Sequence, residues 1–129
     1  MMAMMARDPF DLAGRAALVT GGYGVLGGAI ADGLARAGAR VAILGRRREP
    51  AEARAAALRD GGAEALAVVA DVLDEAAVTA ARDRVLDAWD GIDILVNAAG
   101  GNVQRARSDD RPAFDVPFDA FDEGVRLNL

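Results

Sequence analysis

A glycine-rich turn between an apolar run and a helical pattern constrains the fold of this chain more than any other feature. The stretch Leu18–Ile30 reads LVTGGYGVLGGAI and follows directly on apolar residues 16 and 17. Gly22, Gly24 and Gly27 form the pattern G-x-G-x-x-G. In this pattern glycine permits a tight turn, a close approach to phosphate and close packing of helix on strand. The N–H groups at the start of the helix favour an anion, so the turn predicts a dinucleotide pyrophosphate site.

Four short apolar runs alternate with helical patterns along the chain. We expect strands at about residues 16–20, 40–44, 66–70 and 92–96, and helices at about 25–37, 50–60, 74–89 and 119–129. This alternation predicts a parallel sheet, and right-handed crossovers give the strand order 3-2-1-4. The expected fold class is α/β, a Rossmann-type doubly wound sheet. Residues 1–129 would supply one half-domain of it, ending after the fourth strand and the helix that follows.

Apolar residues at helical spacing give three of the expected helices one apolar face. These faces are Leu26, Ile30 and Leu34; then Val78, Ala81, Val85 and Trp89; then Phe121, Val125 and Leu129. We expect Gly38 and Gly91 to end the first and third helices, and Asp74 to cap the start of the third.

The composition excludes several classes of function. The chain of 129 residues has a net charge of −5 and no basic stripe, so no nucleic-acid partner is expected. It has no cysteine and no histidine, which suits a cytoplasmic protein and argues against a metal site. The apolar opening Met1–Ala6 is too short for a signal peptide and is expected to be a frayed start, and no stretch is long enough to span a membrane. Six acidic residues are expected to be solvated rather than to form a metal or acid/base site: Asp109, Asp110, Asp115, Asp119, Asp122 and Glu123.

The glycine turn resembles that of the short-chain dehydrogenase/reductase family, whose first turn reads T-G-x-x-x-G-x-G. Thr20, Gly21 and Gly27 fall on this pattern, while Val25 replaces the middle glycine and Gly24 lies one place earlier. The variant TGG-x-GVLGGA, with a Gly-Gly-Asn segment after the fourth strand, resembles the subgroup that contains D-mannonate oxidoreductases, also called fructuronate reductases.

The resemblance extends to two further motifs and implies an NAD(P)-binding site. In the family, an Asp followed by an apolar residue after the third strand contacts the adenine ring, as Asp71-Val72 would here. Residues 97–100 (NAAG) resemble the family's N-N-A-G motif with Ala98 in place of the second Asn, and would lie against the ribose and the nicotinamide. The implied cofactor-binding residues are Thr20, Gly21, Gly22, Tyr23, Gly24, Val25, Leu26, Gly27, Gly45, Arg46, Asp71, Val72, Asn97, Ala98, Ala99 and Gly100.

The end of the second strand favours NADP(H) over NAD(H). An NAD site has an acid about twenty residues after the glycines, where it binds the ribose hydroxyl. Here the strand ends in Gly45-Arg46-Arg47-Arg48, so no carboxylate would repel a 2′-phosphate, and Arg46 could pair with one. Arg47 and Arg48 fit a solvated turn. For Arg46 a solvated position and a phosphate contact are equally compatible with the sequence.

The catalytic residues of the family are mostly absent from this chain. Asn128 lies in Leu-Asn-Leu, which resembles the family segment whose asparagine holds a water and orients the catalytic lysine, so Asn128 is the implied catalytic residue. The family otherwise uses a Ser and a Tyr-x-x-x-Lys pair. Tyr23 is the only tyrosine and lysine is absent. We therefore expect a missing catalytic half and no activity from the 129-residue chain itself.

The resemblance implies hydride transfer between a nicotinamide and a carbonyl or secondary alcohol, with a sugar acid such as fructuronate or mannonate as substrate. The full-length protein is expected to be a homo-oligomer. We also expect the free edge of the strand at 92–96 to be covered by another copy or by further residues. Two alternatives remain open. One is a non-catalytic nucleotide-binding module. The other is an S-adenosylmethionine-dependent methyltransferase, whose second strand prefers to end in an acid, against which Gly45-Arg46 argues.

Overall fold

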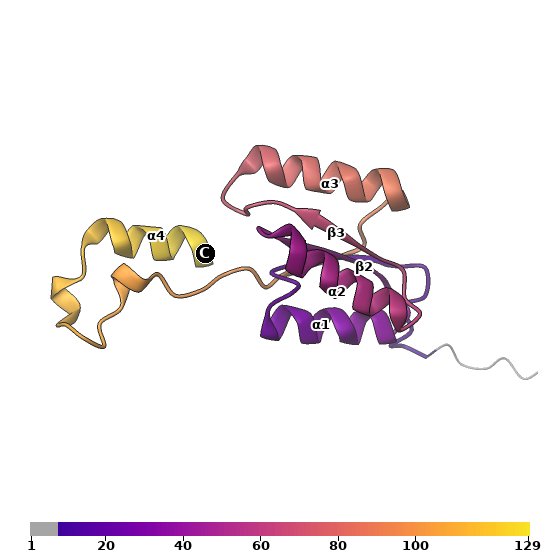
Figure 1. Cartoon of the computed structure of the whole chain (residues 1–129), viewed down its shortest axis with the longest axis horizontal. Coiled ribbons are helices and arrows are strands. Elements are labelled where there is room, and N and C mark those ends of the chain that lie inside the picture. The colour runs from indigo at the N-terminus through magenta and orange to yellow at the C-terminus, as the bar shows by residue number, and fades with distance from the viewer. Residues whose placement is uncertain (1–7) are drawn as a thin grey trace, which may run out of the picture.

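The computed structural model describes residues 8–129, so the start expected at Met1–Ala6 lies outside the described residues. The strands are β1 (Ala16–Thr20), β2 (Arg40–Gly45), β3 (Ala65–Val69) and β4 (Ile94–Asn97). The α-helices are α1 (Val25–Arg36), α2 (Arg48–Asp60), α3 (Glu75–Trp89) and α4 (Phe118–Asn128), with short 3-10 turns η1 (Gln104–Ala106) and η2 (Ala113–Asp115) before α4 (Figure 1). Each predicted strand and helix is present, and its bounds agree to within a residue or two.

The four strands form one parallel sheet in the order β3-β2-β1-β4, as the alternation predicts. Leu18 of β1 lies opposite Ala42 of β2 on one side and Leu95 of β4 on the other. Because all strands run the same way, their carboxyl ends meet at one edge of the sheet. This edge brings together the turn after β1 and the segments that follow β2, β3 and β4.

Alternate residues of the strands pack into two separate cores. Val19, Val41 and Ile43 are buried with residues of α1 and α2. Leu18 and Leu44 are buried on the opposite face with residues of α3. Figure 1 shows the resulting three layers, with α1 and α2 on one side of the sheet and α3 on the other. Every residue of β1 is buried, which explains its continuous apolar sequence.

The buried face of α1 differs from the one expected. Leu26 is 70% exposed, and the residues that the helix buries are Gly27, Gly28 and Ala31. The start of α1 approaches the turn after β1 so closely that only glycine fits there: a Cβ on Gly27 would lie 2.9 Å from the carbonyl carbon of Gly21. Small residues therefore face the sheet, and the larger apolar side chain points outward.

Three aspartates mark the ends of α3 and the start of β4. Asp74 caps α3 as expected, since its carboxylate accepts a hydrogen bond from Ala77 N–H at 3.1 Å. The helix ends at Asp90, which adopts a left-handed conformation with φ 58°, rather than at Gly91. The Asp93 carboxylate accepts a hydrogen bond from Ala16 N–H at 2.8 Å, and β4 begins after it, at Ile94.

Helix α4 lies apart from the three layers, beyond the carboxyl edge of the sheet, with its C-terminal end turned toward them (Figure 1). It packs chiefly against η1. Its expected apolar face is not buried: Phe121, Val125 and Leu129 are exposed, and Ala120 is the residue that the helix buries. Among residues 8–129, no helix is both long enough and apolar enough to cross a membrane.

Candidate functional site

The turn between β1 and α1 requires glycine at two of the predicted positions. Gly21 has φ +63°, a conformation that favours glycine, and a Cβ there would lie 2.7 Å from the carbonyl oxygen of Ala98. Gly27 brings the first turn of α1 against the backbone of Gly21. At Gly21 and Gly27 the turn thus places backbone rather than side chains where it meets the start of α1.

The start of α1 presents free backbone N–H groups at this edge. Gly24 is the N-cap residue, its N–H is donated to Gly21 O at 3.0 Å, and its carbonyl accepts the first helical hydrogen bond, from Gly28 N–H, at 2.8 Å. In this described helix no side chain caps the first turn, and the turn holds no acidic residue. The unpaired N–H groups and the helix dipole would both stabilise an anion here.

Thr20 joins this turn to the loop that follows β4. Its side chain is nearly buried, and its Oγ1 accepts hydrogen bonds from Ala98 N–H and Ala99 N–H, each at 3.1 Å. The hydroxyl also lies 3.5 Å from the carbonyl oxygen of Val96, to which it donates. One hydroxyl therefore satisfies two backbone donors that no strand partner reaches.

A cavity of about 230 Å³ opens at this edge. Ten of the sixteen residues predicted to bind a cofactor line it: Gly21, Tyr23, Gly24, Gly45, Arg46, Asp71, Val72, Ala98, Ala99 and Gly100. Of the three arginines after β2, only Arg46 lines the cavity. Segments far apart in the sequence are thus brought to one place by the four parallel strands.

Six of the predicted residues lie outside the cavity lining. Val25 and Leu26 are exposed at the start of α1, and Asn97 is exposed at the end of β4. Thr20, Gly22 and Gly27 contact the neighbouring loop, strand and turn, and so hold the turn in place. Gly22 N–H is donated to Leu44 O at 3.3 Å, and a Cβ on Gly22 would lie 3.1 Å from two carbons of Ile43.

Sequence reasoning missed three lining residues: Leu44, Ala70 and Leu127. Leu44 and Ala70 immediately precede Gly45 and Asp71, so the ends of the expected strands could have indicated them. Leu127 comes from α4, whose position depends on contacts between distant residues, and no sequence pattern signals it.

Tyr23 and Gly45 pack against each other on one wall of the cavity. The Tyr23 ring occupies the space where a side chain at position 45 would begin. The Tyr23 hydroxyl accepts a hydrogen bond from Arg47 N–H at 3.4 Å, and the Arg47 guanidinium lies 5.8 Å from the centroid of the ring.

Asn128 fastens the C-terminal end of α4 to the loop after β4. Its Oδ1 accepts a hydrogen bond from Gly101 N–H at 3.0 Å, and its Nδ2 donates to Gly101 O at 3.0 Å and to Gly124 O at 2.8 Å. A Cβ on Gly100 would lie 2.7 Å from the Asn128 Oδ1. Both amide hydrogens are engaged with backbone, so the side chain serves as a positioning group here, and its catalytic role stays a prediction.

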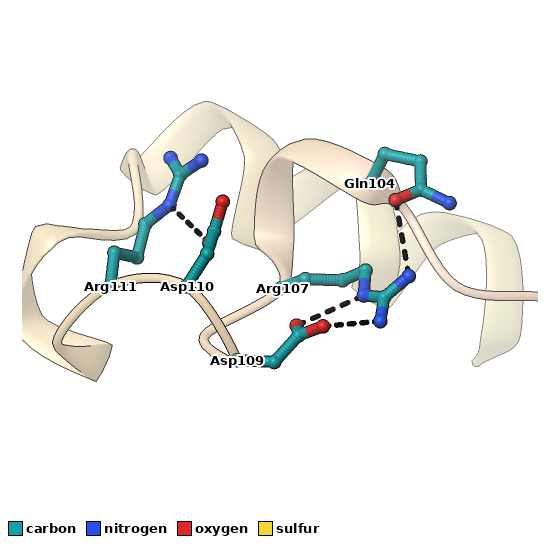
Figure 2. A network of polar contacts seen from close by, with 5 residues as sticks. All are labelled: Gln104, Arg107, Asp109, Asp110 and Arg111. Carbon is teal, nitrogen blue, oxygen red and sulfur yellow. Dashed lines mark hydrogen bonds and ion pairs between the residues drawn. The ribbon is translucent and has the colours of Figure 1, made fainter.

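Two acidic residues of the loop before α4, Asp109 and Asp110, pair with arginines. Arg107 makes two contacts with Asp109 and donates to Gln104 Oε1 at 3.3 Å, while Arg111 Nε lies 3.2 Å from Asp110 Oδ1 (Figure 2). Hydrogen bonds from Arg107 and Arg111 hold the pKa of Asp109 and of Asp110 below the usual range. Within residues 8–129, no group of three or more acidic side chains is placed so that it could hold a metal ion.

A wider cavity, of about 560 Å³, lies between the loop after β4 and α4. Val103, Arg107, Phe121 and Val125 are among its lining residues. It shares no residue with the smaller cavity. Because the glycine turn, the start of α1 and the ends of β2 and β3 all converge on the smaller one, that cavity is the candidate site.

Residues 15–129 match the family model described as short chain dehydrogenase. Among curated proteins, the D-threitol dehydrogenase of Mycolicibacterium smegmatis is 40% identical over 120 residues, which cover 93% of this chain and 44% of that protein.

Two solved structures resemble this one closely. A short chain dehydrogenase from Burkholderia cenocepacia in complex with NADP is 41% identical, with a TM-score of 0.78 over 92% of this chain and 46% of that chain. A protein assigned as a D-mannonate oxidoreductase from Haemophilus influenza, with bound NAD, is 28% identical, with a TM-score of 0.86 over 92% of this chain and 46% of that chain. The chain thus spans less than half the length of these relatives.

Proposed function

Because this chain belongs to the short-chain dehydrogenase family, we propose that it forms the nicotinamide-dinucleotide-binding half of an oxidoreductase. The observation that carries the proposal is the cavity at the carboxyl edge of the sheet, where the glycine turn and the uncapped start of α1 meet. A pyrophosphate would fit there because Gly21 and Gly27 add no side chain where the turn meets the start of α1. NADP and NAD are bound by the two relatives whose solved structures this chain resembles.

The other cavity residues would each contact a different part of the dinucleotide. Asp71 and Val72, at the end of β3, would hold the adenine. Ala98, Ala99 and Gly100 would lie against the ribose and the nicotinamide. Thr20 would hold that loop in place through its two backbone hydrogen bonds.

We propose NADP(H) rather than NAD(H) as the preferred cofactor. Position 45 carries no acid, and Arg46 lines the cavity beside it. A charge-assisted contact of Arg46 with a 2′-phosphate contributes about 1.5–3 kcal/mol, which corresponds to roughly tenfold or more in affinity.

Titration of the chain with NADP⁺ and with NAD⁺ tests this preference. We expect Arg46→Ala to weaken NADP⁺ binding about tenfold or more and to leave NAD⁺ binding nearly unchanged. Arg48→Ala is the matched control, because Arg48 lies in the same basic run but not in the cavity. Equal losses for both dinucleotides would contradict the assignment to NADP(H), and no binding of either would contradict the proposed function.

The whole protein would transfer a hydride between the nicotinamide, which supplies the redox chemistry, and a carbonyl or secondary alcohol. A sugar alcohol or sugar acid is the proposed substrate class. Its support is a D-threitol dehydrogenase among the relatives and a protein assigned as a D-mannonate oxidoreductase among the structures. The role of this chain's residues is to bind and orient the dinucleotide.

We expect the 129-residue chain by itself to turn over no substrate. It has no lysine, and its one tyrosine, Tyr23, is not part of a Tyr-x-x-x-Lys pair. We expect no oxidation of NADPH above background with D-fructuronate or erythrulose as substrate, although the chain binds the cofactor. An NADPH-oxidising activity that copurifies with the chain and is absent from the Arg46→Ala variant would show that a different set of residues performs the chemistry.

A further inference from the structure

Position 45 is glycine for a reason that the backbone does not explain. Gly45 is not among the described glycines with positive φ, so its conformation is open to other residues. The obstacle is a side chain. The Tyr23 ring overlaps the site of a Cβ at position 45, with its Cδ1 and Cζ each 2.8 Å from that point. Real Cβ atoms essentially never come so close to another atom, so a residue larger than glycine at position 45 requires the ring to shift.

The Tyr23 ring is held in this place from three directions. Its inner side packs against the core formed by Val19, Ile43 and their neighbours. Its hydroxyl accepts the hydrogen bond from Arg47 N–H, and the Arg47 guanidinium lies over its face. Moving the ring aside would break these contacts together.

The place that Tyr23 fills is the one where a carboxylate would bind the ribose hydroxyl of NAD. We propose that Tyr23 is a specificity-determining residue, whose ring keeps position 45 without a side chain and so excludes the carboxylate that NAD requires. Arg46, which lines the cavity beside position 45, is then the residue that would pair with a 2′-phosphate. This inference rests on the proposed function, and it adds that the preference is fixed by a pair of positions, 23 and 45.

A first experiment tests the packing without any cofactor. In the wild-type background, Gly45→Ala should lower Tm by roughly 5 °C or more, because the added methyl has no room. In the Tyr23→Ala background the same change should lower Tm by less than half as much. Tyr23→Phe is the matched control: it keeps the ring and loses the hydroxyl, so Gly45→Ala should remain as costly there as in the wild type.

A second experiment tests cofactor choice by titrating four chains with NADP⁺ and NAD⁺: wild type, G45D, Y23A and Y23A/G45D. The ratio of the two dissociation constants should move toward NAD⁺ by about tenfold or more in Y23A/G45D. G45D alone should bind both dinucleotides poorly, because its carboxylate and the ring compete for one space. Y23A alone should keep the NADP⁺ preference, since Arg46 remains.

The outcomes separate this inference from the proposed function. A wild-type chain that binds neither dinucleotide overturns both, whatever the melting temperatures. A wild-type chain that binds NADP⁺ supports the proposed function. The inference then fails if Gly45→Ala costs the same with and without the ring, or if G45D shifts the ratio toward NAD⁺ equally in the wild-type and Y23A backgrounds. It is supported if both effects depend on the ring.

Discussion

Thr20 shows how much of the site depends on one small side chain. It lies at the end of a fully buried strand, and its hydroxyl holds two N–H groups of the loop after β4. The resemblance to the family assigned Thr20 to the cofactor. In the structure its hydroxyl binds the backbone of the loop after β4. Because that loop lines the cavity, this contact is compatible with a role in holding the cofactor.

We expect Thr20→Val to destabilise the chain by about 1–3 kcal/mol, because valine has the same shape but leaves the N–H groups of Ala98 and Ala99 without an acceptor. Urea unfolding followed by tryptophan fluorescence measures the change. Thr20→Ser keeps the hydroxyl and removes only a methyl group, so it should cost about 1 kcal/mol or less. A larger loss for serine than for valine would show that the methyl group matters more than the hydroxyl.

Ion pairs between exposed residues hold the elements that follow β4 to one another. Arg105 of η1 lies 2.5 Å from Asp119 and 3.9 Å from Glu123, both in α4. The hydrogen bond from Arg105 lowers the pKa of Asp119. A lowered pKa in the folded state means that the pair stabilises the contact above the unfolded pKa, near 3.9. That contribution is lost as the pH falls through the folded value.

Acidification should therefore loosen the contact of η1 with α4 before it affects the sheet. We expect backbone ¹⁵N order parameters in residues 104–106 and 118–124 to fall as the pH is lowered below about 4, while those of β1 stay constant. Asp119→Asn should give the low values already at pH 6. Added salt at pH 6 should act in the same direction, because exposed pairs are screened. Order parameters that do not change with pH would exclude Asp119 as the group that holds this contact.

The strands, their order and the presence of α4 were predictable from the sequence, but the position of α4 was not. Buried parallel strands read as apolar runs, and one right-handed crossover rule then orders them. The face of α1 was predicted only in part: Leu34 packs against the core, but Leu26 is exposed because close packing selected the small residues Gly27, Gly28 and Ala31. Helix α4 is placed by Asn128 on a loop 27 residues earlier, a contact that local pattern does not encode. The same holds for the packing of Tyr23 on Gly45.

At the scale of the whole molecule, β4 is an edge strand of the sheet with an exposed apolar residue. Among the residues that the structure describes, it pairs only with β1, and Leu95 is 59% exposed. A free strand edge with apolar neighbours is a template for pairing with another chain. The expectation from the sequence, that this edge is covered by another copy or by further residues, stays a prediction.

Sedimentation velocity over a range of concentrations tests it. We expect the 129-residue chain to self-associate, and Leu95→Arg to reduce that association by placing a charge beside the edge. Phe10→Arg removes an even more exposed apolar side chain from a different part of the molecule and should leave the association unchanged. A wild-type chain that stays monomeric at every concentration would show that the edge is not a docking surface.

The separation of α4 from the three layers bears on how the unfolding of this chain can be measured. Trp89, the single tryptophan, lies in α3 within 5.6 Å of the Arg40 guanidinium, so its fluorescence follows the layered body. Circular dichroism sums all four helices, including α4, which packs chiefly against η1. The two signals should give different transition curves, because α4 can be lost while the sheet persists. A single free energy of unfolding fitted to both signals together then describes neither part, whereas tryptophan fluorescence alone reports the cooperative unfolding of the layered body.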